Sequence, residues 1–147
     1  MAVTTFNARV KTKQGLMVEC ESRGFKVIID EPVEAGGTNQ GMNPLELLLC
    51  SLGSCQAITA VIFAEKFGVK LEDFWVEVEG DLDLDGFMCL ADVRPGYSDI
   101  KFHFHIKSDS PEENIQKLVD LIMAKCPVTD SLANQVQIGN PKYTIER

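Results

Sequence analysis

The sequence predicts an α+β domain with an antiparallel sheet and one long, buried helix, and two observations lead to this prediction. Short runs in which apolar and polar residues alternate are separated by turn residues, a pattern typical of half-buried antiparallel strands. Between these runs, the segment from Leu47 to Ala64 contains no charged residue. A helix that is apolar on nearly every side has to be surrounded by protein, so this segment is predicted to be the central helix.

Length, charge and cysteine content limit the classes of function. With 147 residues the chain is predicted to be a single domain over residues 1–147, and its net charge of −8 disfavours nucleic acid and anionic membranes as partners. The uncharged segment approaches the roughly 20 residues that span a bilayer, but small and polar residues interrupt it, so no membrane span is expected. The N-terminal residues show no secretory signal pattern, which predicts a cytoplasmic location. Five cysteines then favour buried packing, redox chemistry or metal ligation over a disulfide framework.

Three strands are predicted before the central helix. They cover roughly residues 6–11, 16–21 and 25–29 and form an antiparallel meander with a turn at Gln14-Gly15. A loop rich in glycine follows at residues 31–41. Asn43 and Pro44 are the predicted N-cap and first residue of the central helix, and Gly68 is predicted to end it.

A second group of strands and helices is predicted after Gly68. Residues 74–84 and 100–106 alternate at period two and are read as strands. Ser110-Pro111 is expected to open an amphipathic helix, with Ser110 as its N-cap. Pro127 is expected to start a short helix to about Ala133, and a last strand is predicted near Gln135 to Ile145.

Two cysteines have surroundings suited to reactivity. Cys126 immediately precedes Pro127, so its thiol is predicted at the positive N-terminal end of the short helix, where the thiol pKa is lowered. Cys55 lies in the central helix among small residues, which leaves space beside its sulfur. Cys50 is turned from Cys55 by roughly 140° on the same helix, so the two thiols cannot share one partner. The alternative is that both Cys55 and Cys126 are ordinary buried cysteines.

Two other patterns are considered for metal binding. His103 and His105 project from the same face of one predicted strand, a spacing that can support a metal. No third ligand with matching spacing is evident and the cysteines do not form Cys-x-x-Cys pairs, so no metal site is predicted, and a metal protein is kept as a third alternative. Asp81, Asp83 and Asp85 match the start of a calcium loop, but the strand pattern favours an acidic hairpin.

Two spaced motifs resemble a known family. The first comprises Gly37-Thr38-Asn39 and Asn43-Pro44, then Glu46-Leu47-Leu48 and the stretch to Cys55, and the second is Cys126-Pro127-Val128 at the end of a later helix. Together with the order of strands and helices, they are similar to the OsmC/Ohr family of thiol-dependent peroxide reductases. The resemblance implies antiparallel sheets wrapped around the central helix. It also implies an intertwined homodimer with two sites at the interface, in which the partner buries each central helix.

The resemblance implies site residues and a reaction as well. Cys55 matches the family's peroxidatic cysteine, and Cys126 matches its resolving cysteine. The implied reaction is attack of the Cys55 thiolate on the O–O bond of an alkyl or fatty-acid hydroperoxide, after which Cys126 converts the Cys55 sulfenic acid into a disulfide. No cofactor is implied, but an external thiol reductant is required.

Two features differ from the family pattern. Where the family carries a glutamate directly after Asn-Pro, this sequence has Leu45, and Glu46 lies one step later, roughly 100° around the helix. The family arginine is missing from both of its usual places; Lys13 stands at the first, and Arg9 and Arg23 are the nearest substitutes. Glu46, Lys13 and Arg23 are therefore predicted to be supporting residues of the site.

A different class of function fits the same resemblance. In this alternative the protein is a non-catalytic, OsmC-like binding protein, and an apolar pocket that includes Leu48, Leu52, Ile58 and Phe63 holds an apolar small molecule. The two thiols would then be passive or would sense the redox state. Peroxide consumption that depends on Cys55 separates this alternative from the enzyme.

Overall fold

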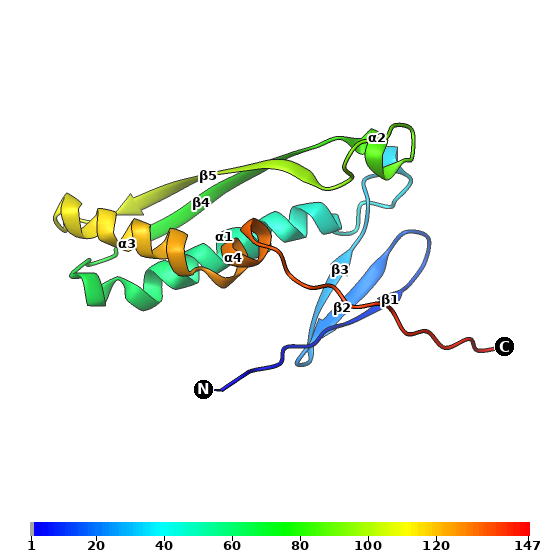
Figure 1. Ribbon diagram of the computed structural model, residues 1–147, viewed down its shortest axis with the longest axis horizontal. Coiled ribbons are helices and arrows are strands. Elements are labelled where there is room, and N and C mark those ends of the chain that lie inside the picture. Colours follow the sequence, from blue (N-terminus) through cyan, green and yellow to red (C-terminus); the bar gives the residue numbers. More distant parts are fainter. Residues whose placement is uncertain (1) are drawn as a thin grey trace. The chain divides into compact units, whose positions relative to one another are not determined.

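A computed structural model describes residues 2–147 and shows an α+β fold with two small antiparallel sheets and several helices (Figure 1). The chain divides into two compact units, residues 1–50 and residues 51–147, which are described separately. The elements in chain order are β1 (Arg9–Thr12), β2 (Val18–Ser22), β3 (Phe25–Ile29), the 3-10 helix η1 (Val33–Ala35), α1 (Pro44–Phe63), the 3-10 helix η2 (Glu65–Phe67), β4 (Asp73–Leu82), α2 (Leu84–Phe87), β5 (Tyr97–Lys107), α3 (Glu112–Lys125) and α4 (Pro127–Ala133).

The first unit contains the predicted three-stranded meander, in the order β1-β2-β3. Both pairs are antiparallel, and Cys20 on β2 lies opposite Val10 on β1 and Val27 on β3. Gly15 has a φ of +61°, a left-handed conformation that glycine adopts without steric cost, and it forms the predicted turn between β1 and β2. The first strand starts at Arg9, three residues later than predicted.

One buried carboxylate, Asp30, organises the loop after β3. Its side chain accepts hydrogen bonds from the backbone N–H groups of Glu31, Thr38 and Gln40 and from the Thr38 hydroxyl. The Thr38 hydroxyl is the main cause of the lowered pKa of Asp30 and outweighs the effect of burial. Four bonds to one side chain fix the glycine-rich loop that leads into α1.

The central helix α1 begins with a capping box at Asn43 and Glu46. The Asn43 side-chain oxygen accepts a hydrogen bond from the Glu46 N–H at 2.9 Å, and the Glu46 carboxylate accepts one from the Asn43 N–H at 2.8 Å. This confirms Asn43 as the N-cap. At the other end the α-helix stops at Phe63, the turn η2 follows, and Gly68, with a φ of +67°, ends it as predicted.

Within the second unit, α1 has one buried face and one exposed face. Leu52, Gln56, Thr59 and Ala60 are buried, whereas the other face carries side chains that are more than half exposed: Ile58 at 59%, Val61 at 68% and Ile62 at 64%. By length and composition α1 could also span a membrane. Its buried face packs against protein, as in the core helix of a soluble domain. The single chain therefore buries α1 on one side only, whereas the sequence predicted burial on every side.

The second sheet is the β4-β5 hairpin, which lies along α1 and α3 (Figure 1). The residues alternate as predicted: Val76 and Val78 face Gly53 of α1, where an added Cβ would lie 3.2 Å from Val78. The buried core of this unit joins the hairpin to the helices, with Phe74 and Phe104 packed against a cluster of Ala60, Ala64, Val69, Leu118 and Ile122. A larger residue at position 53 would therefore need a small shift of the Val78 side chain.

The part of the chain after β4 confirms two predicted helices and corrects two details. Helix α3 carries its apolar stripe inward, and α4 spans Pro127–Ala133 as predicted. Ser110 does not cap α3, because its hydroxyl accepts a hydrogen bond from the Lys70 N–H. The one-turn helix α2, capped by Asp83, was not predicted.

The predicted last strand near Gln135 to Ile145 is wrong, because the structure has no strand there. A strand needs the backbone of a neighbouring strand, and no described residue pairs with this segment. Pro141 lies within it and has no backbone N–H to donate to a ladder. Its apolar side chains Val136, Ile138, Tyr143 and Ile145 are exposed.

The capping box gives a test of the role of Glu46. Replacing Asn43 with alanine removes the N-cap and is expected to lower the free energy of unfolding by about 1 kcal/mol. Glu46→Ala should also destabilise the fold, whereas Glu46→Gln should leave stability nearly unchanged, because glutamine also serves in a capping box. Urea unfolding followed by circular dichroism measures all three. Equal loss in Glu46→Ala and Glu46→Gln would contradict the capping role.

Candidate functional site

The structure brings the two predicted cysteines together within the second unit. Cys55 lies on α1, and Cys126 is the single residue that joins α3 to α4. The backbone of Cys126 is extended, as the following proline requires, and its N–H bonds to Ile122 at 3.0 Å. The two thiols lie close enough together for each to shift the pKa of the other. Cys126 is 1% exposed and Cys55 is partly exposed, so the pair is reached from solvent through Cys55.

The electrostatic surroundings favour a thiolate at Cys126. Burial raises the cost of ionising it, but this is outweighed by hydrogen bonding from the Thr129 hydroxyl, the Thr129 and Val128 N–H groups and the Cys55 thiol, so the pKa of Cys126 is lowered. Thr129 and Val128 belong to the first turn of α4. The direction agrees with the lowered pKa expected for a cysteine just before Pro127.

The pKa of Cys55 shifts in the opposite direction. Burial raises it most, and the side-chain bond to Cys126 adds to this effect, whereas the Val128 N–H and the Thr59 hydroxyl lower it. None of these groups is a cation. Of the two coupled thiols, Cys126 is therefore the more acidic.

Two polar residues beside the thiols were missed by sequence reasoning. The Gln56 side-chain amide donates to the Thr129 hydroxyl at 3.4 Å, and Thr129 in turn bonds to Cys126. Gln56 is fully buried, and its side-chain oxygen has no hydrogen-bond partner among the described residues. A glutamine next to Cys55 in an otherwise apolar helix, and a threonine three residues after Cys126, are the signals that could have identified them.

The three predicted supporting residues all lie in the first unit, where each has a partner. Glu46 completes the capping box of α1. Lys13, beside the β1–β2 turn, lies 3.6 Å from the Glu19 carboxylate. Arg23, in the β2–β3 turn, lies 5.2 Å from the centre of the Phe25 ring. Because Lys13 and Arg23 are at opposite ends of β2, they cannot both serve one thiol.

The predicted apolar pocket is not formed by the described chain alone. Leu52 is buried in the core and Phe63 packs against the core cluster, but Ile58 is exposed on the outer face of α1. Cys50 is exposed on that same face, away from the buried side chains of α1, as its angular position predicts. The thiol pair is consequently the part of the predicted site that one chain builds.

Comparison with known proteins supports the same family. A family model described as OsmC-like protein matches residues 37–139. A protein of Mycoplasma genitalium named hydroperoxide reductase is 25% identical over 119 residues, 78% of this chain and 77% of its own length. The crystal structure of an OsmC-like protein from Mycoplasma pneumoniae has a TM-score of 0.78 at 21% identity over 88% of both chains. An organic hydroperoxide resistance protein OsmC from Legionella pneumophila has a TM-score of 0.66 at 22% identity, over 90% of this chain and 91% of its own.

The role of Thr129 can be tested directly. Thr129→Val removes the hydroxyl that stabilises the Cys126 thiolate and is expected to raise the pKa of Cys126, so less thiolate forms near neutral pH. Thr129→Ser keeps the hydroxyl and should titrate like the wild type. Thiolate absorbance at 240 nm against pH, with the Cys126→Ser curve subtracted, measures the shift. Identical curves for the valine and serine variants would show that the hydroxyl has no such role.

Proposed function

Because the chain belongs to the OsmC-like protein family, we propose that it reduces organic hydroperoxides with the Cys55 and Cys126 pair. The observation that carries the proposal is that the two thiols lie beside one another at the first turn of α4, close enough for each to shift the pKa of the other. A sulfenic acid formed on either sulfur would have a thiol beside it, ready for condensation. The curated name hydroperoxide reductase of a relative supports the same class of substrate.

The proposed cycle has three balanced steps. The Cys55 thiolate attacks one oxygen of an alkyl or fatty-acid hydroperoxide, the O–O bond breaks, and the leaving alkoxide takes a proton to become an alcohol. Cys126 then attacks the Cys55 sulfenic acid, which forms the disulfide and releases water. An external dithiol returns both sulfurs to the reduced state and becomes oxidised itself. No bound cofactor takes part.

The first step requires a proton to leave Cys55. The raised pKa of Cys55 opposes this loss, whereas the lowered pKa of Cys126 makes its thiolate easier to form. Transfer of the proton to Cys126 creates the attacking thiolate, and Cys126 then carries the proton that leaves during disulfide formation. A cation near Cys55 would favour this transfer.

We propose that a second copy of the chain completes the site, in an intertwined homodimer. The outer face of α1 presents Ile58, Val61 and Ile62 to solvent, an apolar strip on a helix that also holds Cys55. Lys13 or Arg23 is the proposed cation, and Glu46 is a proposed supporting carboxylate in addition to its capping role. Burial of the strip by the partner would also form the apolar wall of the peroxide pocket.

Three further statements belong to this proposal. Residues 1–147 form one functional domain, which the family match to residues 37–139 supports because it spans both compact units. The protein works in the cytoplasm, where thiol reductants keep cysteines reduced. Neither nucleic acid nor a membrane is a partner, in keeping with the net charge of −8.

Peroxidase activity is the decisive measurement. The reduced protein should consume cumene hydroperoxide with dithiothreitol as reductant, and Cys55→Ser should abolish this turnover. Cys126→Ser should retain a single round of peroxide consumption and accumulate sulfenic acid on Cys55, detectable by dimedone labelling and mass spectrometry. Cys50→Ser, which changes an exposed cysteine of the same helix, is the matched control and should keep wild-type activity.

Two outcomes would contradict the proposed scheme. Peroxide consumption no faster in the wild type than in Cys55→Ser would favour the non-catalytic binding or sensing protein. A stable sulfenic acid on Cys126 in the Cys55→Ser variant, with full single-turnover activity, would reverse the roles of the two cysteines.

The homodimer can be tested without activity. Sedimentation velocity should show the wild type as a dimer, and Val61→Glu, which places a charge on the outer face of α1, should shift it toward monomer. Leu90→Glu changes an exposed apolar side chain outside α1 and should remain dimeric. Circular dichroism verifies that both variants are folded. A wild type that sediments as a monomer would contradict the dimer.

A further inference from the structure

We infer that the outward face of the β4-β5 hairpin holds a site for a divalent transition-metal ion, formed by Glu77, His103 and His105. One ligand atom from each of these side chains lies within 4.8 Å of the other two. Two imidazoles and a carboxylate are a ligand set that suits Zn²⁺ and neighbouring first-row ions. The inference does not depend on the thiol pair or on the peroxide chemistry.

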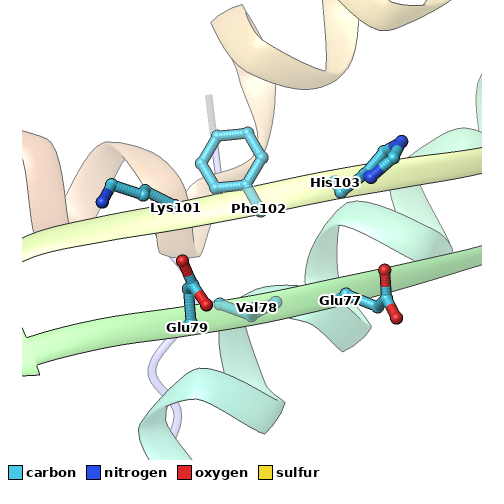
Figure 2. A pocket seen from close by; sticks show the side chains of 6 residues that line it. All are labelled: Glu77, Val78, Glu79, Lys101, Phe102 and His103. Atoms are coloured by element: carbon cyan, nitrogen blue, oxygen red, sulfur yellow. The ribbon is translucent and has the colours of Figure 1, made fainter.

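The strand register explains how the three side chains converge. Glu77 on β4 lies directly opposite His103 on β5, and Trp75 lies opposite His105. Residues two apart on a strand share a face, so all four side chains project from the same side of the hairpin. Figure 2 shows Glu77 and His103 across from one another on the two strands. Both line an open pocket of about 420 Å³. No third ligand is evident from spacing along the sequence, because Glu77 comes from the neighbouring strand.

Stacking holds the histidine rings in place. The His105 ring stacks on Trp75 with centroids 4.6 Å apart and an angle of 2° between planes. The His103 ring stacks on His105 at 4.2 Å. A hydrogen bond of 2.8 Å joins His105 Nε2 to a Glu77 carboxylate oxygen. Fixed rings reduce the side-chain entropy that a metal would otherwise have to remove on binding.

The distances suit contraction around one ion. Zinc bonds of about 2.0–2.2 Å in tetrahedral geometry place ligand atoms roughly 3.4 Å apart. The His105–Glu77 pair would open slightly from 2.8 Å, and the third ligand atom would approach by rotation of an exposed side chain. Three protein ligands leave a fourth position for water.

The local charge distribution favours a cation. Lysines on the same strand are engaged by other carboxylates, Lys101 by Asp99 at 3.4 Å and Lys107 by Glu72 at 3.6 Å. The Glu77 carboxylate lies 2.8 Å from His105 Nε2 and is 70% exposed, so it is open to an ion from solvent. A divalent ion would be coordinated by both side chains of this pair and by His103.

Trp75 provides a local reporter, because it is the only tryptophan of the chain and stacks on a proposed ligand. Metal-free, reduced protein is titrated with Ni²⁺ while tryptophan emission is recorded. Quenching should saturate at one equivalent per chain and be reversed by excess Zn²⁺. His103→Gln leaves the Trp75–His105 stack in place and should weaken Ni²⁺ binding on the order of ten-fold or more, since even second-shell changes cost that much at metal sites.

Glu79→Gln is the matched control, because Glu79 lies two residues from Glu77 on the same face of β4. This variant should bind Ni²⁺ like the wild type, whereas Glu77→Gln should bind it more weakly. Non-saturating quenching in the wild type would overturn the site. Equal binding curves for the wild type and His103→Gln would place the metal elsewhere, for example on the thiols. Equal weakening of Ni²⁺ binding by Glu79→Gln and Glu77→Gln would also contradict the site, because binding would then depend only on the overall negative charge of this face.

Discussion

The packing of the inner face of α1 against the hairpin and α3 is the constraint on which the candidate site depends. Ala60 of α1 and Ala64, directly after α1, pack with Leu118 and Ile122 of α3 in one buried cluster. This contact fixes the end of α3, and therefore Cys126, at the level of Cys55 on α1. Burial of such a cluster is worth several kcal/mol by apolar area alone. The relative position of the two thiols is thus set by core packing.

The same arrangement shifts the pKa values of the two thiols in opposite directions. Cys126 sits at the start of α4, where two backbone N–H groups and the Thr129 hydroxyl stabilise negative charge, while the side of α1 that holds Cys55 supplies mainly burial. An asymmetric pair of this kind is chemically useful, because one sulfur must give up its proton as the other receives it. Gln56 extends the asymmetry, since its amide orients the Thr129 hydroxyl and leaves its own oxygen unpartnered.

Local patterns predicted most of the fold because they are governed by nearest neighbours. Period-two alternation located β4 and β5, and Pro127 located the start of α4. Such local patterns could not predict the third potential metal ligand, Glu77. Fourteen residues, including the unpredicted helix α2, separate β4 from β5. The sequence therefore does not reveal the strand register that places Glu77 opposite His103. The capping role of Glu46 could have been predicted from the sequence, because Asn43 and Glu46 have the spacing of a capping box. The C-terminal strand failed because its pattern does not reveal whether a neighbouring strand exists.

The exposed face of α1 and the unpaired C-terminal segment point to one cause. Both carry apolar side chains in the alternation or helical spacing of buried elements, and both lack a covering surface among residues 2–147. An isolated chain would leave these side chains in water at a cost of roughly 25 cal/mol for each Å² that burial would remove. In the homodimer proposed above, a second copy would cover the helix face and would also offer a strand edge to the C-terminal segment. The apolar patterns of α1 and of the C-terminal segment, which a single chain leaves exposed, are therefore those that an intertwined homodimer would bury.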